Sequence, residues 1–174
     1  MEVDETSLPQ RTKQNPPAGG RRRSHQGKMP VASAVEVNGG RPGRVRLEAI
    51  PDYSAETLHG ILNRNLAPGT TAQTDAWEAY PGAPEVIHKP YTIGPKAAHI
   101  VLPWVHRVFA NLKTWALGVY HGLRRRHLQA YLDEFAFRFN RRHSRHAAFR
   151  RLLGLSTKVQ PITYKMLVAP EAEA

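Results

Sequence analysis

The sequence predicts an α/β fold in which a mixed five-stranded sheet is flanked by helices and followed by a helical C-terminal part. Short β-prone runs separated by turn residues occupy the first half of the chain. From Leu102 onward, apolar residues recur at spacings of three and four, which is typical of helices. Because a single core of about 100–150 residues is stable alone, we expect one domain at 1–155 and a tail at 156–174.

The β-rich half begins with a short apolar run that ends at Asp4. Residues 31–37 and 45–50 then read as two strands of a hairpin, joined by the turn-forming residues 38–43. Residues 9–30 contain no acid and are rich in proline, glycine and basic residues. Such a stretch cannot bury apolar surface, so it predicts a basic flexible loop.

The next elements alternate between helix and strand. Asp52 or Ser54 can cap a helix that runs through Asn65. The β-prone residues 71–74 lead into Asp75, and residues 85–88 form another short strand.

Three helices are expected after Leu102. The first begins at Pro103, a residue that suits the first helical position. The second covers residues 126–141, and the third covers residues 147–153. The expected core-facing stripe of the first helix is Val105, Val108, Leu112, Trp115 and Val119.

This order of elements is what an RNase H-like fold requires. The first strand lies at the centre of the sheet, and a helix crosses over to a parallel strand on its other side. Asp4 and Asp75, 71 residues apart, would then lie side by side. Two facing carboxylates need cations between them to relieve their repulsion, so the pair predicts a Mg²⁺ site.

Composition points to a polyanionic partner. The chain has 25 Lys and Arg against 14 Asp and Glu, a net charge of +11. The absence of cysteine excludes disulfides and Cys-ligated zinc. No apolar run is long enough for a membrane span and no signal peptide follows Met1, so we expect a cytoplasmic, nucleoid-associated protein without a membrane partner. A basic protein without a specific partner and an RNA- or ribosome-associated module stay open as alternatives.

Four motifs, in order, resemble bacterial insertion-sequence transposases of the DDE superfamily. The most similar subgroup has Glu, Asn or His as its third catalytic residue, followed seven residues later by Lys. The motifs are Val3-Asp4-Glu5-Thr6, Thr74-Asp75-Ala76-Trp77, residues 102–113 with Tyr120-His121-Gly122, and residues 127–135 with 138–142.

The resemblance implies a site and a reaction. Asp4 and Asp75 would be metal ligands, His106 would fill the third position as a catalytic residue and ligand, and Lys113 would be the accompanying base. Two Mg²⁺ or Mn²⁺ ions would support DNA cleavage and strand transfer at insertion-sequence ends. The partners would be transposon-end and target DNA, bound by a homo-oligomer. The chain looks like a catalytic domain truncated at its N-terminus, so an inactive DNA-binding remnant or inhibitor is the alternative.

The spacing of His106 and Lys113 agrees with a shared role. At 100° per residue the two lie about 20° apart on a helix, on one face. No Asp or Glu lies between Glu85 and Asp133, so the usual third carboxylate cannot come from this helix. Against this, Mg²⁺ prefers oxygen to nitrogen, and a helical His is by default a surface or core-edge residue.

Other residues compete for the metal or for DNA. Glu5 follows Asp4 and should point to the opposite face of the strand, and Glu48 has no assured place near the site. Asp133 and Glu134 are weaker candidates, and Trp77 could stack on a base or lie in the core. The residues expected to contact DNA, unless they form only a solvated basic surface, are Arg21, Arg22, Arg23, Lys113, Arg124, Arg125, Arg126, Arg138, Arg141 and Arg142.

Overall fold

The computed structural model describes residues 1–10, 27–75, 77–83, 85–91, 98–120, 123–161, 163, 164 and 166. Most of the loop expected at 9–30, including Arg21, Arg22 and Arg23, lies outside the described residues. No helix in the described part of the chain is both long and apolar enough to cross a membrane.

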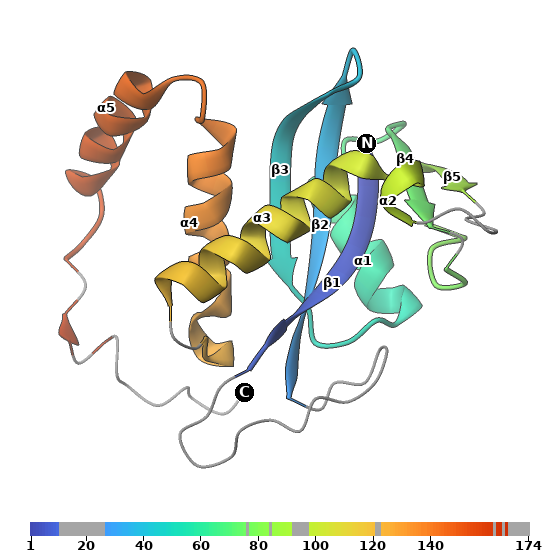
Figure 1. Cartoon of the computed structure of the whole chain (residues 1–174), viewed down its shortest axis with the longest axis horizontal. Helices are drawn as coiled ribbons and strands as arrows, with labels where there is room; N and C mark the ends of the chain where they lie inside the picture. Colours follow the sequence, from blue (N-terminus) through green and yellow to red (C-terminus); the bar gives the residue numbers. More distant parts are fainter. Residues whose placement is uncertain are drawn as a thin grey trace.

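Five strands form one mixed sheet in the order β3-β2-β1-β4-β5 (Figure 1). Strand β1 pairs antiparallel with β2 and parallel with β4, so it lies at the centre. This arrangement confirms the predicted RNase H-like α/β fold. The strands are β1 (Glu2–Pro9), β2 (Lys28–Asn38), β3 (Arg41–Ala49), β4 (Thr71–Asp75) and β5 (Ile87–Tyr91).

The helices follow the predicted order, with a short additional one. Of the two proposed caps of α1, Ser54 is the N-cap, and its side chain accepts a hydrogen bond from the Thr57 N–H. Asp52 supports this cap by accepting hydrogen bonds from the hydroxyls of Ser54 and Thr57. The helices are α1 (Ala55–Asn65), α2 (Ala98–Val101), α3 (Pro103–Val119), the 3₁₀ turn η1 (Arg125–His127), α4 (Leu128–Asn140) and α5 (Arg145–Ser156).

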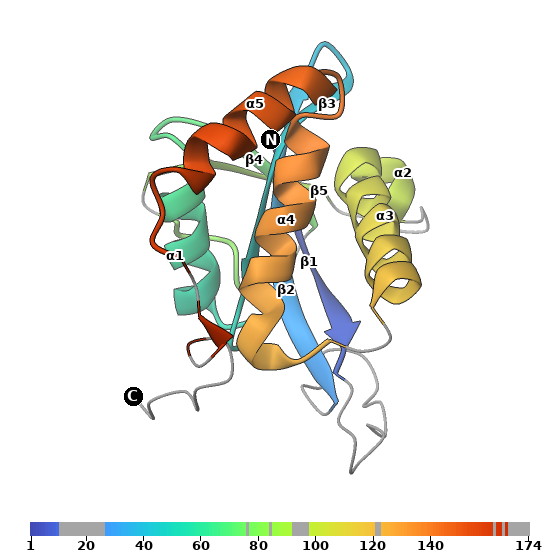
Figure 2. The same ribbon diagram turned by 90° about the vertical axis from the view of Figure 1, so that its left-hand side faces the viewer.

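The sheet is covered on both faces (Figure 2). Helix α1 packs on one face in a core that includes Val3, whereas α3 and α4 pack on the other face in a core that includes Leu8. Side chains alternate between faces along a strand. Asp4, like Leu8, therefore faces α3.

The structure corrects several boundaries. Strands β1 and β2 extend into the expected loop, because Leu8 pairs with Met29 and both side chains are buried. Strand β5 begins at Ile87 rather than at residue 85, and α5 is longer than expected at both ends.

The expectation that Val119 of α3 faces the core was wrong. Val119 is 56% exposed, because it ends the helix and the chain returns to the core through the buried Leu123. Within α3, Phe109 and Ala116 are buried in addition to the expected Val105, Val108 and Leu112.

Candidate active site

Strands β1 and β4 bring Asp4 and Asp75 to the same level of the sheet. Glu2 pairs with Gln73 across these parallel strands. Asp4 lies two residues after Glu2, and Asp75 lies two residues after Gln73. Neighbouring strands lie about 4.8 Å apart. Ala72 belongs to the core beneath α1, so Asp75, three residues later, faces α3 as Asp4 does.

The position of Asp4 differs from the expectation of a strand end. Asp4 lies inside β1, whose pairing with β2 continues to Pro9, whereas Asp75 does end its strand. A central position leaves Asp4 only 7% exposed. Its Oδ1 accepts a hydrogen bond from the Glu5 N–H at 2.8 Å, and Oδ1 of Asp75 accepts one from the Trp77 N–H at 3.2 Å.

Helix α3 places His106 beside Asp4. The imidazole Nε2 lies 3.5 Å from Oδ2 of Asp4, an ion-pair distance when the ring is protonated. The His106 side chain is 28% exposed, and its ring packs edge-on against Phe109 at 6.3 Å between centroids. Lys113 is half-buried two turns further along α3, on the same side of the helix as His106.

Sequence reasoning missed Glu2. This acid is 4% exposed, and its Oε2 accepts hydrogen bonds from the N–H groups of Trp104 and Val105 at 2.7 and 2.8 Å. Burial raises the pKa of Glu2, while the two backbone N–H donors act in the opposite direction. The available signal was its position two residues before Asp4, which puts both side chains on one face of the strand.

Tyr80 belongs to the core on the α1 face of the sheet, opposite to the face of Asp4. Tyr80 is fully buried, and this burial, followed by the charge of the nearby Glu5, raises the pKa of Tyr80 well above its usual value. The charges of Asp4 and Asp75 raise that pKa further, as expected if both acids lie near the phenol. Glu5 therefore points away from the face of Asp4, as its position predicted.

The donor atoms around Asp4 fit a hard divalent cation in their chemistry. Two carboxylates meet on this face, and the Ser33 side chain lies directly opposite Asp4 on β2. Its Oγ is buried without a hydrogen-bond partner in the described part of the chain. All of these are oxygen ligands of the kind Mg²⁺ prefers. Among the described residues, however, no three His, Cys, Asp or Glu side chains gather closely enough to form a metal site.

The sequence matches the ISXO2-like transposase domain family over residues 1–140. The chain belongs to this family. The match spans the two acids, His106 and Lys113, so the resemblance to DDE-type insertion-sequence transposases is confirmed at the level of the family. No curated protein matches the chain.

The rival acids of the transposase domain lie elsewhere. Glu48 pairs with Arg64 and accepts a hydrogen bond from Asn65 at 2.8 Å, on the α1 side of the sheet. Asp133 accepts a hydrogen bond from Gln129 of the same helix. Glu134 pairs with Arg138 at 2.6 Å. Trp77 is partly buried against the α1 core, in agreement with a core role.

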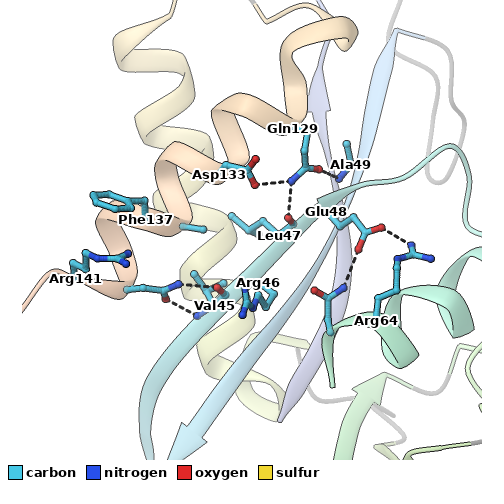
Figure 3. Close-up of a pocket in the computed structure, with 13 residues that line it drawn as sticks. Val45, Arg46, Leu47, Glu48, Ala49, Arg64, Gln129, Asp133, Phe137 and Arg141 are labelled. Atoms are coloured by element: carbon cyan, nitrogen blue, oxygen red, sulfur yellow. Dashed lines mark hydrogen bonds and ion pairs between the residues drawn. The ribbon is translucent and has the colours of Figure 1, made fainter. Parts of the chain in front are cut away.

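A groove of about 770 Å³ in the transposase domain lies at the free edge of β3, between α1 and α4 (Figure 3). Strand β2 separates this edge from β1, so the groove is distinct from the acid pair. Gln129 and Asn140 of α4 hydrogen-bond to the backbone of β3 along one wall. Glu48 and Arg64 form part of the other wall.

The predicted DNA-binding arginines fall into two groups. Arg124, Arg125 and Arg126 are exposed around η1. Arg138 pairs with Glu134, and Arg141 stacks on Phe137 at 4.0 Å. Arg142 donates hydrogen bonds to the carbonyls of Pro42, Gly43 and Phe139, so it ties the end of α4 to the beginning of β3.

Proposed function

We propose that this transposase domain cleaves DNA strands and joins the resulting 3′-hydroxyl ends to target DNA, in a reaction that depends on divalent metal ions. One observation carries the proposal. Asp4 and Asp75 occupy level positions on neighbouring parallel strands, with His106 3.5 Å from Asp4. Membership of a transposase family supports the same reaction class.

Asp4 and Asp75 are the residues that would hold the metal. When bound, two Mg²⁺ or Mn²⁺ ions would activate the attacking hydroxyl and stabilise the leaving oxygen of the phosphodiester. Asp4 supplies negative charge at a nearly buried position, where an electrostatic interaction is stronger than in water, and Asp75 is partly buried. Ser33 adds a neutral oxygen beside them.

His106 supplies a group that can hold or move a proton at Nε2, beside Asp4. A histidine has the side chain whose ordinary pKa is closest to neutral pH, so its protonation can change during a reaction cycle. Lys113, two turns along the same side of α3, would contact a phosphate near the scissile bond. The exposed arginines around η1 would hold the DNA backbone without reading its sequence.

Metal-dependent nicking of supercoiled plasmid tests the proposal. We expect the wild type to nick the plasmid with MgCl₂ or MnCl₂ and not with EDTA. Asp75→Asn should lower the rate by roughly 100-fold or more, because an amide removes the charge that attracts the cation. Asp133→Asn is the matched control, because this acid lies on α4 and hydrogen-bonds only locally to Gln129 among the contacts described.

Equal rates for the wild type and Asp75→Asn would overturn the proposal. If neither protein nicks the plasmid but both bind DNA, the chain acts instead as a DNA-binding remnant or inhibitor. A labelled duplex in a gel-shift experiment, run at the same protein concentrations, separates these outcomes.

A further inference from the structure

Helix α3 begins without a cap of its own. Leu102 occupies the N-cap position and makes no side-chain hydrogen bond, and the first turn contains no acidic residue. The first N–H groups of a helix need partners from outside the helix. Pro103 removes one of these donors, and Glu2 satisfies the next two, those of Trp104 and Val105, with a single carboxylate oxygen.

These two hydrogen bonds join distant parts of the chain at the proposed site. Glu2 and Asp4 are two residues apart on one face of β1, a rise of about 6.7 Å. Trp104, Val105 and His106 are consecutive residues of the first turn of α3. The carboxylate of Glu2 therefore fixes the height and rotation of the segment that carries His106, relative to the strand that carries Asp4.

The hydrogen bond that the His106 N–H makes within the helix is longer than the two bonds to Glu2. The His106 N–H donates to the Leu102 carbonyl at 3.4 Å, which is long for a helical hydrogen bond. The bonds to Glu2 are 2.7 and 2.8 Å, as expected for a charged acceptor. The amides of Trp104 and Val105 are thus tied to β1 by two short hydrogen bonds.

We propose that Glu2 is a positioning residue that holds His106 against Asp4 by capping α3 from the neighbouring strand. The inference rests on the proposed function for its effect on cleavage. The positioning itself is a property of the fold, and it can be measured without any reaction.

The first test is structural. Amide hydrogen exchange and nuclear Overhauser contacts are measured by NMR in the wild type, Glu2→Gln, Glu2→Asp and Glu2→Ala. In Glu2→Ala we expect faster exchange of the Trp104 and Val105 amides and loss of the contacts between the His106 ring and β1. Glu2→Gln should retain both, because its amide oxygen still accepts the two bonds. Unchanged exchange and contacts in Glu2→Ala would overturn the proposal.

The second test is kinetic and uses single-turnover cleavage. Glu2→Ala should lower the rate at saturating DNA by about 10- to 100-fold, since a small misplacement of a reacting group has effects of this size. The DNA concentration at half-saturation should change less than about twofold, because Glu2 is buried and does not contact the ligand. Glu2→Gln should restore the rate to within about threefold of the wild type.

Two further variants keep the kinetic test decisive. If Glu2→Ala does not fold, Glu2→Asp keeps the charge with a side chain too short to reach both amides, and it should lose about tenfold in rate. Val35→Ala removes volume from the same core and controls for a general loss of stability. An equal rate loss in Val35→Ala would overturn the positioning role. A wild type that does not cleave at all refutes the proposed function and leaves the NMR result to decide the role of Glu2.

Discussion

At the scale of single residues, the buried polar side chains mark the site more clearly than any cavity does. Glu2, Asp4, Ser33 and Thr74 are the buried polar or charged residues in the described part of the chain. All of them lie on β1, β2 or β4 at neighbouring levels of the sheet, Glu2, Asp4 and Ser33 on the face of α3 and Thr74 on the face of α1. Burial of polar groups is costly unless they are paired, so such a concentration is typical of a functional site.

His88 gives a pH-dependent prediction at this scale. Its Nε2 lies 2.8 Å from Oγ1 of the buried Thr74, and its ring stacks on Tyr80 at 6.0 Å. Burial, and then the nearby His59, lower the pKa of His88. The unfolded chain therefore binds a proton more readily than the folded one as the pH falls through the ordinary value of about 6.5.

This difference should make the folded protein progressively less stable as the pH falls below about 6.5. His88→Gln should flatten that dependence, as measured by urea unfolding at several pH values. His143→Gln, a change at an exposed histidine, should leave the dependence as it is in the wild type. A His88→Gln variant with the wild-type slope would contradict the assigned cause.

At the scale of elements, α4 protects the free edge of β3 with side-chain amides. Asn140 donates to the Val45 carbonyl at 3.0 Å and accepts from the Val45 N–H at 2.7 Å, as a neighbouring strand would. Gln129 bridges the Leu47 carbonyl and the Ala49 N–H in the same way. An unprotected edge strand invites pairing with another chain, so these amides limit association at this edge.

Asn140→Leu tests this function of α4. The change leaves both backbone groups of the buried Val45 without their partner, and it should lower the free energy of unfolding by about 2 kcal/mol. Urea unfolding followed by circular dichroism measures the loss. Asn111→Leu, at an exposed position of α3, is the matched control and should change stability by less than about 0.5 kcal/mol. Equal stability of the two variants would contradict the edge-protecting role.

The sequence predicted the elements better than the contacts between them. Helix α1 connects β3 to β4, and β4 pairs parallel with β1. This connection follows a general rule of topology, so the neighbouring positions of Asp4 and Asp75 could be foreseen. The capping of α3 by Glu2 could not be foreseen, because Glu2 bonds to N–H groups that are more than 100 residues away in the chain. Periodicity likewise predicted the inner face of α3 but not where that helix leaves the core, at Val119.

At the scale of the whole molecule, basic residues outnumber acidic residues, and the ion pairs in the described part of the chain leave this excess unbalanced. The net charge is +11. Arg64 and Arg138 pair with Glu48 and Glu134, and Arg142 is engaged with backbone carbonyls. Arg124 and Arg125 at η1 are exposed and have no acidic partner among the described residues, although Arg125 donates a hydrogen bond to the Lys28 carbonyl at 3.5 Å. A surface of this kind suits the phosphate backbone of DNA, and it lies apart from the acids that would hold the metal.

The salt dependence of DNA binding tests this assignment. Each phosphate contact contributes about −0.9 to the slope of the logarithm of the binding constant against the logarithm of salt concentration. Replacing Arg124, Arg125 and Arg126 together with alanine should therefore make the slope shallower by up to about 3. Fluorescence anisotropy of a labelled 30-base-pair duplex between about 50 and 300 mM KCl measures the slope. Arg64→Ala is the control, because this cation is already paired with Glu48. If the triple variant keeps the wild-type slope, the DNA backbone follows another surface of the domain.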